Sequence, residues 1–267
     1  MNNNFFAYIL NSKVTALRFE EIVKKIENWV DMDDKQKYVC VCNTHSLVTA
    51  AEDEKFNQVL DNAEICTPDG MPLVWALKAV GYKEQDRVDG PNLMLKLCEQ
   101  AEIKGYKVYF YGGTEEVLDR LNKHLLHLYP NLQVVGTYSP PFRSLSDEEK
   151  KEINNRINAS SADLVFTSLG CPKQELWMYE NSKAINSILL GVGAAFNFII
   201  GDIKRPPAIF QKIGLEWLFR LICEPKRLWK RYLYNNTRYI YYYAKTFNKN
   251  KVKTLNVTNH VKNSDVK

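Results

Sequence analysis

The sequence predicts an α/β fold in which a mainly parallel sheet carries helices on both faces and is followed by a basic, aromatic helical segment. Three observations support this prediction. Short apolar runs typical of buried strands alternate with segments whose apolar residues recur at helical spacing. The connections between them are short, as expected when helices link parallel strands. The 267 residues, 45% hydrophobic and 25% charged, provide ample material for a core.

The elements follow one another in a regular order. Residues 18–32 repeat apolar side chains at helical spacing and predict an amphipathic helix. Pro91 suits the first position of a later helix, and residues 146–149 have the spacing of a capping box. Strands are expected at 37–42, 63–66, 107–111, 132–136, 163–168 and 187–192. Further helices are expected at 73–80, 91–104, 115–129 and 146–159.

Four strands end in polar or glycine-rich clusters, at residues 43–45, 68–70, 112–114 and 172–175. The carboxyl ends of parallel strands lie along one edge of a sheet, where open α/β folds bind their ligands. We therefore expect the four clusters to converge on one site. Asp69 follows a buried strand at a turn, and this position suits a catalytic base.

Two of these clusters also have a simpler interpretation. Asp69 taken alone is equally well explained as the cap of the next helix, and only the convergence of strand ends favours the catalytic role. Gly112 and Gly113 stand between a strand and a helix, where backbone N–H groups can approach a phosphate. The same pair often marks only a tight turn.

The cysteine pattern and the hydropathy limit the class of protein. The six cysteines form no CxxC pair and lie mostly in apolar runs, so we expect reduced core thiols rather than disulfides or zinc ligands. No segment resembles a signal peptide, and no apolar run approaches the ~20 residues of a transmembrane helix. We therefore expect a chain that stays on the cytosolic side of the membrane.

Positive charge is concentrated near the C-terminus. Residues 203–251 contain twelve Lys or Arg against two Glu, whereas the whole chain has a formal net charge of only +5. Aromatic side chains alternate with these cations, a pattern that suits a membrane interface. A basic, aromatic surface can also bind single-stranded nucleic acid, and some of the aromatics can simply be core. We expect residues 248–267, which are polar, to be disordered.

A series of motifs follows in order along residues 40–232, at residues 43–44, 67–70, 87–90, 112–113, 169–175, 191–196, 205–207, 214–220 and 224–227. Together these motifs resemble the WecG/TagA/CpsF family of bacterial glycosyltransferases. The resemblance implies a compact Rossmann-like fold of the GT-E type and an inverting transfer of a sugar, typically N-acetylmannosamine, from a UDP donor. The implied acceptor is N-acetylglucosamine linked through diphosphate to undecaprenol, in teichoic acid, capsule or related polysaccharide synthesis.

The resemblance also assigns roles to single residues. Asp69 matches the proposed general base, Arg87 matches an arginine at the reacting groups or the diphosphate, and Thr44 matches a polar residue of the pocket. Arg220 and Arg227 match arginines that contact diphosphate in the family. The full set of expected substrate-binding residues is Asn43, Gly70, Gly112, Gly113, Lys173, Gln174, Glu175, Asn197, Arg220, Arg227 and Lys230.

Two positions depart from the family pattern. Asn197 stands where an aspartate is common, and Pro206 stands where alanine is usual, so the preferred donor is open between N-acetylmannosamine, its uronic acid and glucose. Asp31 and Asp33 fit the metal-binding Asp-x-Asp pattern of other glycosyltransferases, but they end an exposed, charge-rich helix. We expect no metal and no cofactor, with cationic side chains in the metal's place.

The resemblance completes the expected organisation. An α/β catalytic domain should cover residues 1–202, and an appendage that closes over the site and docks on the membrane should cover residues 203–247. The protein should be peripheral on the inner face of the cell membrane and able to form homo-oligomers. The competing hypotheses are a non-catalytic nucleotide- or RNA-binding module and a UDP-sugar hydrolase or epimerase. Neither of these would need both the carboxylate of Asp69 and a lipid-facing segment.

Overall fold

The computed structural model describes residues 5–264, and it confirms the α/β class. The chain forms two compact units. The first contains the residues up to 18, residues 42–88 and the residues from 206 onward; the second contains residues 19–41 and 89–205. The C-terminal segment thus shares a unit with residues 42–88, whereas the sequence led us to expect a division near residue 202.

The second unit contains five of the six strands of the larger sheet, in the order β3-β8-β7-β5-β6. Their pairings are parallel. The five strands are β3 (Lys37–Cys42), β5 (Lys107–Gly112), β6 (Gln133–Tyr138), β7 (Leu164–Ser168) and β8 (Ile188–Gly191). Each overlaps a predicted strand, and the boundaries differ by no more than two residues.

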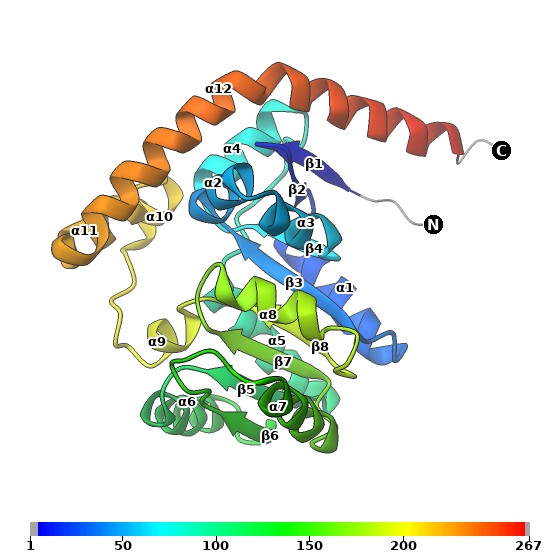
Figure 1. The fold of residues 1–267 in the computed structure, drawn as a ribbon, viewed down its shortest axis with the longest axis vertical. Coiled ribbons are helices and arrows are strands. Elements are labelled where there is room, and N and C mark those ends of the chain that lie inside the picture. Colours follow the sequence, from blue (N-terminus) through cyan, green and yellow to red (C-terminus); the bar gives the residue numbers. More distant parts are fainter. Residues whose placement is uncertain (1–4, 265–267) are drawn as a thin grey trace. The chain divides into compact units, whose positions relative to one another are not determined.

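Helices cover both faces of this part of the sheet. On one face α5 packs against α1 and α9, and α9 packs against α6; α7 and α8 lie on the other face, in front in Figure 1. These helices are α1 (Phe19–Asp31), α5 (Gly90–Lys104), α6 (Glu115–Leu128), α7 (Asp147–Ala159), α8 (Lys173–Asn181) and α9 (Ala195–Ile199). The predicted capping box is confirmed, because Ser146 and Glu149 exchange hydrogen bonds at the start of α7.

Aromatic rings fill the core between the sheet and α9. Phe110 of β5 stacks on Phe166 of β7 with a centroid distance of 5.8 Å, and Phe196 of α9 meets Phe110 edge-on at the same distance. All three rings are fully buried. This cluster fixes α9 against the two central strands.

The first unit combines a small hairpin with helices and the remaining strand, β4 (Ile65–Pro68). The antiparallel hairpin of β1 (Phe6–Ile9) and β2 (Ser12–Thr15) turns at Leu10 and Asn11, both with positive φ. We did not predict this hairpin, because its turn has no glycine. The helices are α2 (Thr44–Glu52), α3 (Glu54–Asn62), α4 (Met71–Ala79), α10 (Ala208–Lys212), α11 (Glu216–Cys223) and α12 (Pro225–Ser264).

The long helix α12 packs along α2 and β1 (Figure 1). Among the α12 side chains that the structure describes, as far as residue 247, Leu228, Asn235 and Tyr239 are buried. They recur at helical spacing and define the face turned toward the unit. The segment that we expected to be disordered, residues 248–267, is helical as far as Ser264, and the last three residues lie outside the described part of the chain.

Two general expectations can be compared with this structure. Cys40, Cys42, Cys66 and Cys98 are buried as predicted, and burial raises the pKa of the Cys98 thiol. Cys223 is exposed on α11, so for it the expected core position is wrong. Within residues 5–264, no helix combines the length and the apolar character that a membrane span requires.

Candidate functional site

Asp69 lies directly after β4, in the turn that leads into α4. Its backbone N–H donates to the carbonyl of Cys42 at the end of β3, over 2.8 Å, which fixes the turn beside that strand. Gly70, not Asp69, is the N-cap residue of α4. The structure therefore does not support the simpler interpretation of Asp69 as a helix cap.

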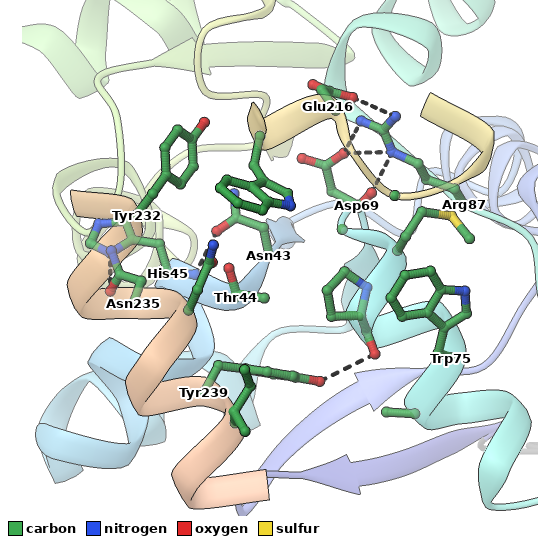
Figure 2. A pocket seen from close by; sticks show the side chains of 18 of the residues that line it. Asn43, Thr44, His45, Asp69, Trp75, Arg87, Glu216, Tyr232, Asn235 and Tyr239 are labelled. Atoms are coloured by element: carbon green, nitrogen blue, oxygen red, sulfur yellow. Dashed lines mark hydrogen bonds and ion pairs between the residues drawn. The ribbon is translucent and has the colours of Figure 1, made fainter. Parts of the chain in front are cut away.

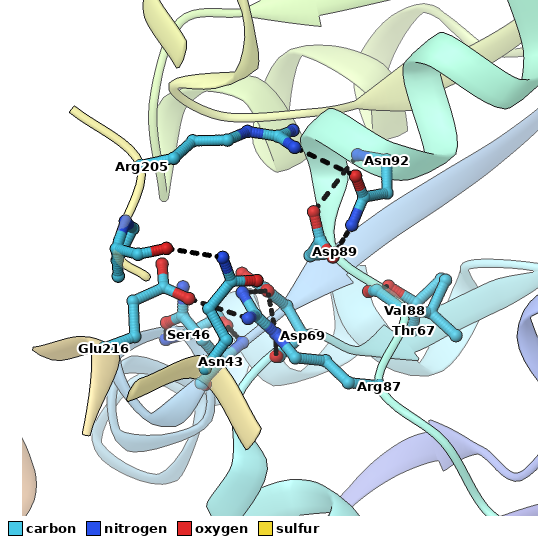
Figure 3. A network of polar contacts seen from close by, with 12 residues as sticks. Asn43, Ser46, Thr67, Asp69, Arg87, Val88, Asp89, Asn92, Arg205 and Glu216 are labelled. Atoms are coloured by element: carbon cyan, nitrogen blue, oxygen red, sulfur yellow. Dashed lines mark hydrogen bonds and ion pairs between the residues drawn. The ribbon is translucent and has the colours of Figure 1, made fainter. Parts of the chain in front are cut away.

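The backbone of residues 87–88 brings Arg87 to Asp69. The Thr67 hydroxyl donates to the Val88 carbonyl over 3.0 Å (Figure 3). The Val88 N–H donates to the Pro68 carbonyl over 3.1 Å. These bonds hold the segment alongside the end of β4. Two residues 18 positions apart in the sequence thereby become neighbours.

The guanidinium of Arg87 lies between two carboxylates. Its Nη2 is 2.8 Å from Oδ1 of Asp69 and its Nη1 is 2.7 Å from Oε2 of Glu216, the first residue of α11. The Arg87 Nε also donates to the Asp69 backbone carbonyl. The side chains of Arg87 and Asp69 are only 18% and 23% exposed, so solvent screens this pair less than a surface pair. The guanidinium is therefore placed to orient the Asp69 carboxylate through charge-assisted hydrogen bonds.

These residues form the polar end of a cavity of about 740 Å³ that lies within the first unit (Figure 2). Five of the expected site residues line it together with Arg87: Asn43, Thr44, Asp69, Gly70 and Arg220. The volume is within the range typical of small-molecule sites. The structure thus brings the expected base, Asp69, and the expected arginine, Arg87, together with the polar residues at the start of α2.

The side chains at the start of α2 have defined local roles. Asn43 caps this helix and accepts hydrogen bonds from the N–H groups of His45 and Ser46. His45 Nδ1 lies 3.3 Å from Oδ1 of Asn235 on α12, so α2 and α12 meet inside the cavity (Figure 2). The positive end of the α2 dipole is directed at this region, which favours an anionic ligand.

The helix α12 presents one face to the cavity and another away from it. Arg231, Asn235, Tyr239 and Tyr243 follow one another at intervals of four residues and line the cavity. Lys230 lies instead on what we call the outer face, formed by Trp229, Lys230, Leu233, Tyr234, Thr237, Arg238 and Tyr241. The structure therefore places Arg231 at the site, whereas we had named Lys230.

The other expected residue of α12, Arg227, does not line this cavity. Its Nε lies 2.6 Å from Oε2 of Glu224, one helical turn earlier, and its side chain is exposed. Arg220 of α11, by contrast, is a lining residue.

The remaining expected residues belong to the second unit. Gly112 and Gly113 have φ angles of 108° and 74°, and Thr114 caps α6 directly after them. Gln174 is buried: its amide donates to Glu175 over 2.9 Å and its Oε1 accepts the Gly193 N–H over 3.1 Å. This amide therefore holds the loop after β8.

Lys173 and Asn197 lie in two short helices of the second unit, Lys173 as the first residue of α8 and Asn197 in the middle of α9. Lys173 is exposed at the first turn of α8. Asn197 is partly buried in α9, and its carbonyl accepts the Ile203 N–H over 3.2 Å. Arg205, another basic candidate, donates to Asn92 over 3.1 Å (Figure 3).

The Asp-x-Asp carboxylates bind side chains of their own unit. Asp31 accepts hydrogen bonds from Tyr106 and Lys104, and Asp33 pairs with Lys35 over 3.1 Å. Within residues 5–264, the structure contains no group of three or more His, Cys, Asp or Glu side chains placed to hold a metal ion.

Sequence reasoning missed several residues of the cavity. Glu216 and Trp217 fall within a family motif that we had quoted, but we had not named them as site residues. Trp75 looks like an ordinary core residue of an apolar helix in the sequence, yet it is 49% exposed and lines the cavity. Among the other lining residues, His45 belongs to a strand-end cluster that we had expected at the site, whereas we had placed Arg231, Tyr232 and Tyr239 only in the basic, aromatic segment. Asn235 had not been singled out.

Comparison with known proteins agrees with the motifs. Residues 7–253 match the model of the glycosyl transferase WecG/TagA/CpsF family. A curated relative from Bacillus spizizenii, an N-acetylglucosaminyldiphosphoundecaprenol N-acetyl-beta-D-mannosaminyltransferase, is 29% identical over 201 residues, which are 75% of this chain and 76% of the relative. The protein is therefore a transferase that belongs to the WecG/TagA/CpsF family of glycosyl transferases.

Proposed function

We propose that this protein transfers a sugar, most simply N-acetylmannosamine, from a UDP donor to N-acetylglucosamine carried on undecaprenyl diphosphate. The name of the Bacillus relative supports this acceptor and this sugar. The observation that carries the proposal is the Asp69–Arg87 pair at the polar end of a cavity that also contains Arg220 and Arg231. A carboxylate beside cations suits a reaction that takes a proton from a hydroxyl while a diphosphate is bound nearby.

The reaction proceeds by a single displacement. Asp69 takes the proton of the acceptor hydroxyl as that oxygen bonds to the anomeric carbon of the donor sugar. The bond between that carbon and the UDP oxygen breaks, its electron pair leaves with UDP, and the anomeric centre inverts. Arg87 orients the Asp69 carboxylate, and the two arginines of α11 and α12 bind the acceptor diphosphate through charge-assisted hydrogen bonds.

The outer face of α12 is the proposed membrane contact. Trp229 and Tyr234 are about half exposed, and each carries a cation over its ring: Lys230 at 5.5 Å from Trp229 and Arg238 at 5.3 Å from Tyr234. Exposed aromatics beside cations suit the headgroup region of an anionic bilayer. The protein would then act as a peripheral protein on the inner face of the cell membrane.

The two faces of α12 predict different effects of two charge removals. Arg231→Gln should raise KM for a short-chain soluble acceptor about tenfold or more, because a charge-assisted hydrogen bond contributes about 1.5–3 kcal/mol. Lys230→Gln should lower binding to vesicles that contain anionic lipid about fivefold, since each cation near such a surface contributes about 1 kcal/mol. Steady-state kinetics and vesicle sedimentation measure the two effects. If Arg231→Gln and Lys230→Gln had the same effect on KM and on vesicle binding, the assignment of one α12 face to the cavity and the other to the membrane would be contradicted.

The function is tested by UDP release. Purified protein is incubated with UDP-N-acetylmannosamine, UDP-N-acetylmannosaminuronic acid or UDP-glucose, with and without a short-chain lipid diphosphate N-acetylglucosamine. We expect release that requires the acceptor and is fastest with UDP-N-acetylmannosamine. Release without any acceptor would identify a hydrolase, and fastest release with another donor would reassign the sugar.

A further inference from the structure

The cavity has a second end whose chemistry differs from the polar end. There, α4 and α12 face each other with side chains that carry no charge: Met71, Pro72, Trp75, Ala76 and Ala79 on α4, and Tyr239, Ile240 and Tyr243 on α12. Sugars and diphosphates are strongly polar, so transfer of the sugar alone does not account for this apolar end. The apolar lining of this end favours the binding of an apolar ligand group.

Direct contacts hold the two helices in place. The Tyr239 hydroxyl donates to the Pro72 carbonyl over 3.2 Å (Figure 2). The Tyr239 ring stacks on the Tyr243 ring with a centroid distance of 5.8 Å. Burial raises the pKa of both tyrosines, as expected where water is scarce. These contacts define one wall of the apolar end.

Trp75 of α4 also lines the apolar end, and the turn between α10 and α11 packs against it. Gly214 in that turn packs so closely on the indole that a Cβ atom there would lie 2.7 Å from the Trp75 ring. Trp75 and Ile240 nevertheless remain 49% and 68% exposed. The small side chains of Ala76 and Ala79 leave space beside the indole. Two large apolar side chains are thus open to a ligand inside a structured cavity.

Polarity changes steadily along the cavity face of α12. Arg231, Asn235, Tyr239 and Tyr243 occupy four successive turns, from a cation through an amide to two aromatic rings. This face spans about 18 Å at a rise of 1.5 Å per residue. A ligand that matches it has an anionic head at one end and an apolar chain at the other.

We propose that the apolar end binds the first isoprene units of the acceptor's lipid chain, while its diphosphate lies toward Arg220 and Arg231. This inference rests on the proposed function, which supplies a prenyl diphosphate as substrate. The cavity volume of about 740 Å³ is typical of a small-molecule site. The cavity can therefore hold only the first part of the lipid chain. The protein therefore recognises the lipid itself and not only the sugar diphosphate attached to it.

The test compares ligands that differ only in the tail. Calorimetric titration measures the Kd of inorganic diphosphate, farnesyl diphosphate and a linear alkyl diphosphate of similar length for the wild type and two variants. Ala79→Trp fills the apolar end, and Ala244→Trp adds the same side chain to an exposed alanine of α12 that lines neither end. Ile240→Asn serves as a second variant of the apolar end should Ala79→Trp fail to fold, as judged by thermal melting.

We expect the wild type and Ala244→Trp to bind farnesyl diphosphate at least about tenfold more tightly than inorganic diphosphate, because the tail buries apolar surface. Ala79→Trp should lose this preference and keep its affinity for inorganic diphosphate. An unchanged preference in both variants of the apolar end would overturn the proposal. If the linear alkyl diphosphate bound as tightly as farnesyl diphosphate, the proposed preference for a prenyl chain would be overturned.

A parallel transfer assay separates this inference from the proposed function. A tail preference without acceptor-dependent UDP release would leave the lipid site standing and refute the function. Acceptor-dependent release whose kcat/KM does not change with tail length would leave the function standing and refute the lipid site. Weaker UDP binding in Ala79→Trp with the tail preference intact would overturn the inference by assigning the apolar end to the uracil ring.

Discussion

Asp69→Asn should lower kcat for sugar transfer by about a hundredfold or more and leave KM nearly unchanged. The amide has the size of the carboxylate but cannot accept the proton of the acceptor hydroxyl, and a positioned general base contributes about 10²- to 10⁴-fold. The second carboxylate partner of Arg87, Glu216 at 2.7 Å, keeps the guanidinium anchored in this variant. Initial rates of UDP release at saturating acceptor measure the effect.

Glu216→Gln is the matched control for this prediction. It removes the other carboxylate partner of the same guanidinium, at nearly the same distance, and leaves Asp69 in place. We expect its kcat to fall by about tenfold at most. Equal losses in Asp69→Asn and Glu216→Gln would show that Asp69 acts by positioning Arg87 and that the proton goes to another group.

Gly112→Ala should lower the free energy of unfolding by about 3 kcal/mol or more. Gly112 has a φ of 108°, a backbone conformation that is strained for residues with a side chain. In addition, a Cβ atom there would lie 2.6 Å from the Ser168 carbonyl oxygen on the neighbouring strand β7. Because backbone cannot move aside as a flexible side chain can, the last pair of the β5–β7 ladder must open. Urea denaturation followed by circular dichroism measures the loss.

Gly201→Ala separates the cost of the positive φ from the cost of the close contact with the neighbouring strand. Gly201 also has a positive φ, 83°, but no atom lies within 4 Å of its hypothetical Cβ. We expect a loss of only about 1 kcal/mol, the cost of the backbone conformation alone. If both variants lost the same amount, close strand packing would not be the reason for glycine at position 112.

Much of the α/β framework could be predicted because local rules determine it. Apolar runs and helical periodicity located the strands of the second unit, and the Ser146–Glu149 capping box fixed the start of α7. Asp69 could be placed at a strand end for the same reason. Its contact with Arg87 is tertiary, since backbone hydrogen bonds between Pro68 and Val88 create it.

The helix faces of the C-terminal segment could not be predicted. Lys230 and Arg231 are adjacent in an unbroken run of cations and aromatics, and sequence alone does not say which of them faces α2. Packing of Leu228, Asn235 and Tyr239 sets the rotation of α12 and brings Arg231 to the cavity. The apolar end escaped prediction for a similar reason, because it depends on α4 and α12, which are far apart in the sequence.

The most direct test of the account is the mass of the acceptor after reaction. Short-chain lipid diphosphate N-acetylglucosamine is incubated with UDP-N-acetylmannosamine and either the wild type or Asp69→Asn, and the lipid product is analysed by mass spectrometry. We expect the wild type to add one N-acetylhexosamine residue to the lipid and the variant to leave the lipid almost unchanged. An unmodified lipid with the wild type, or full conversion with Asp69→Asn, would contradict the assignment of sugar transfer to the Asp69 site.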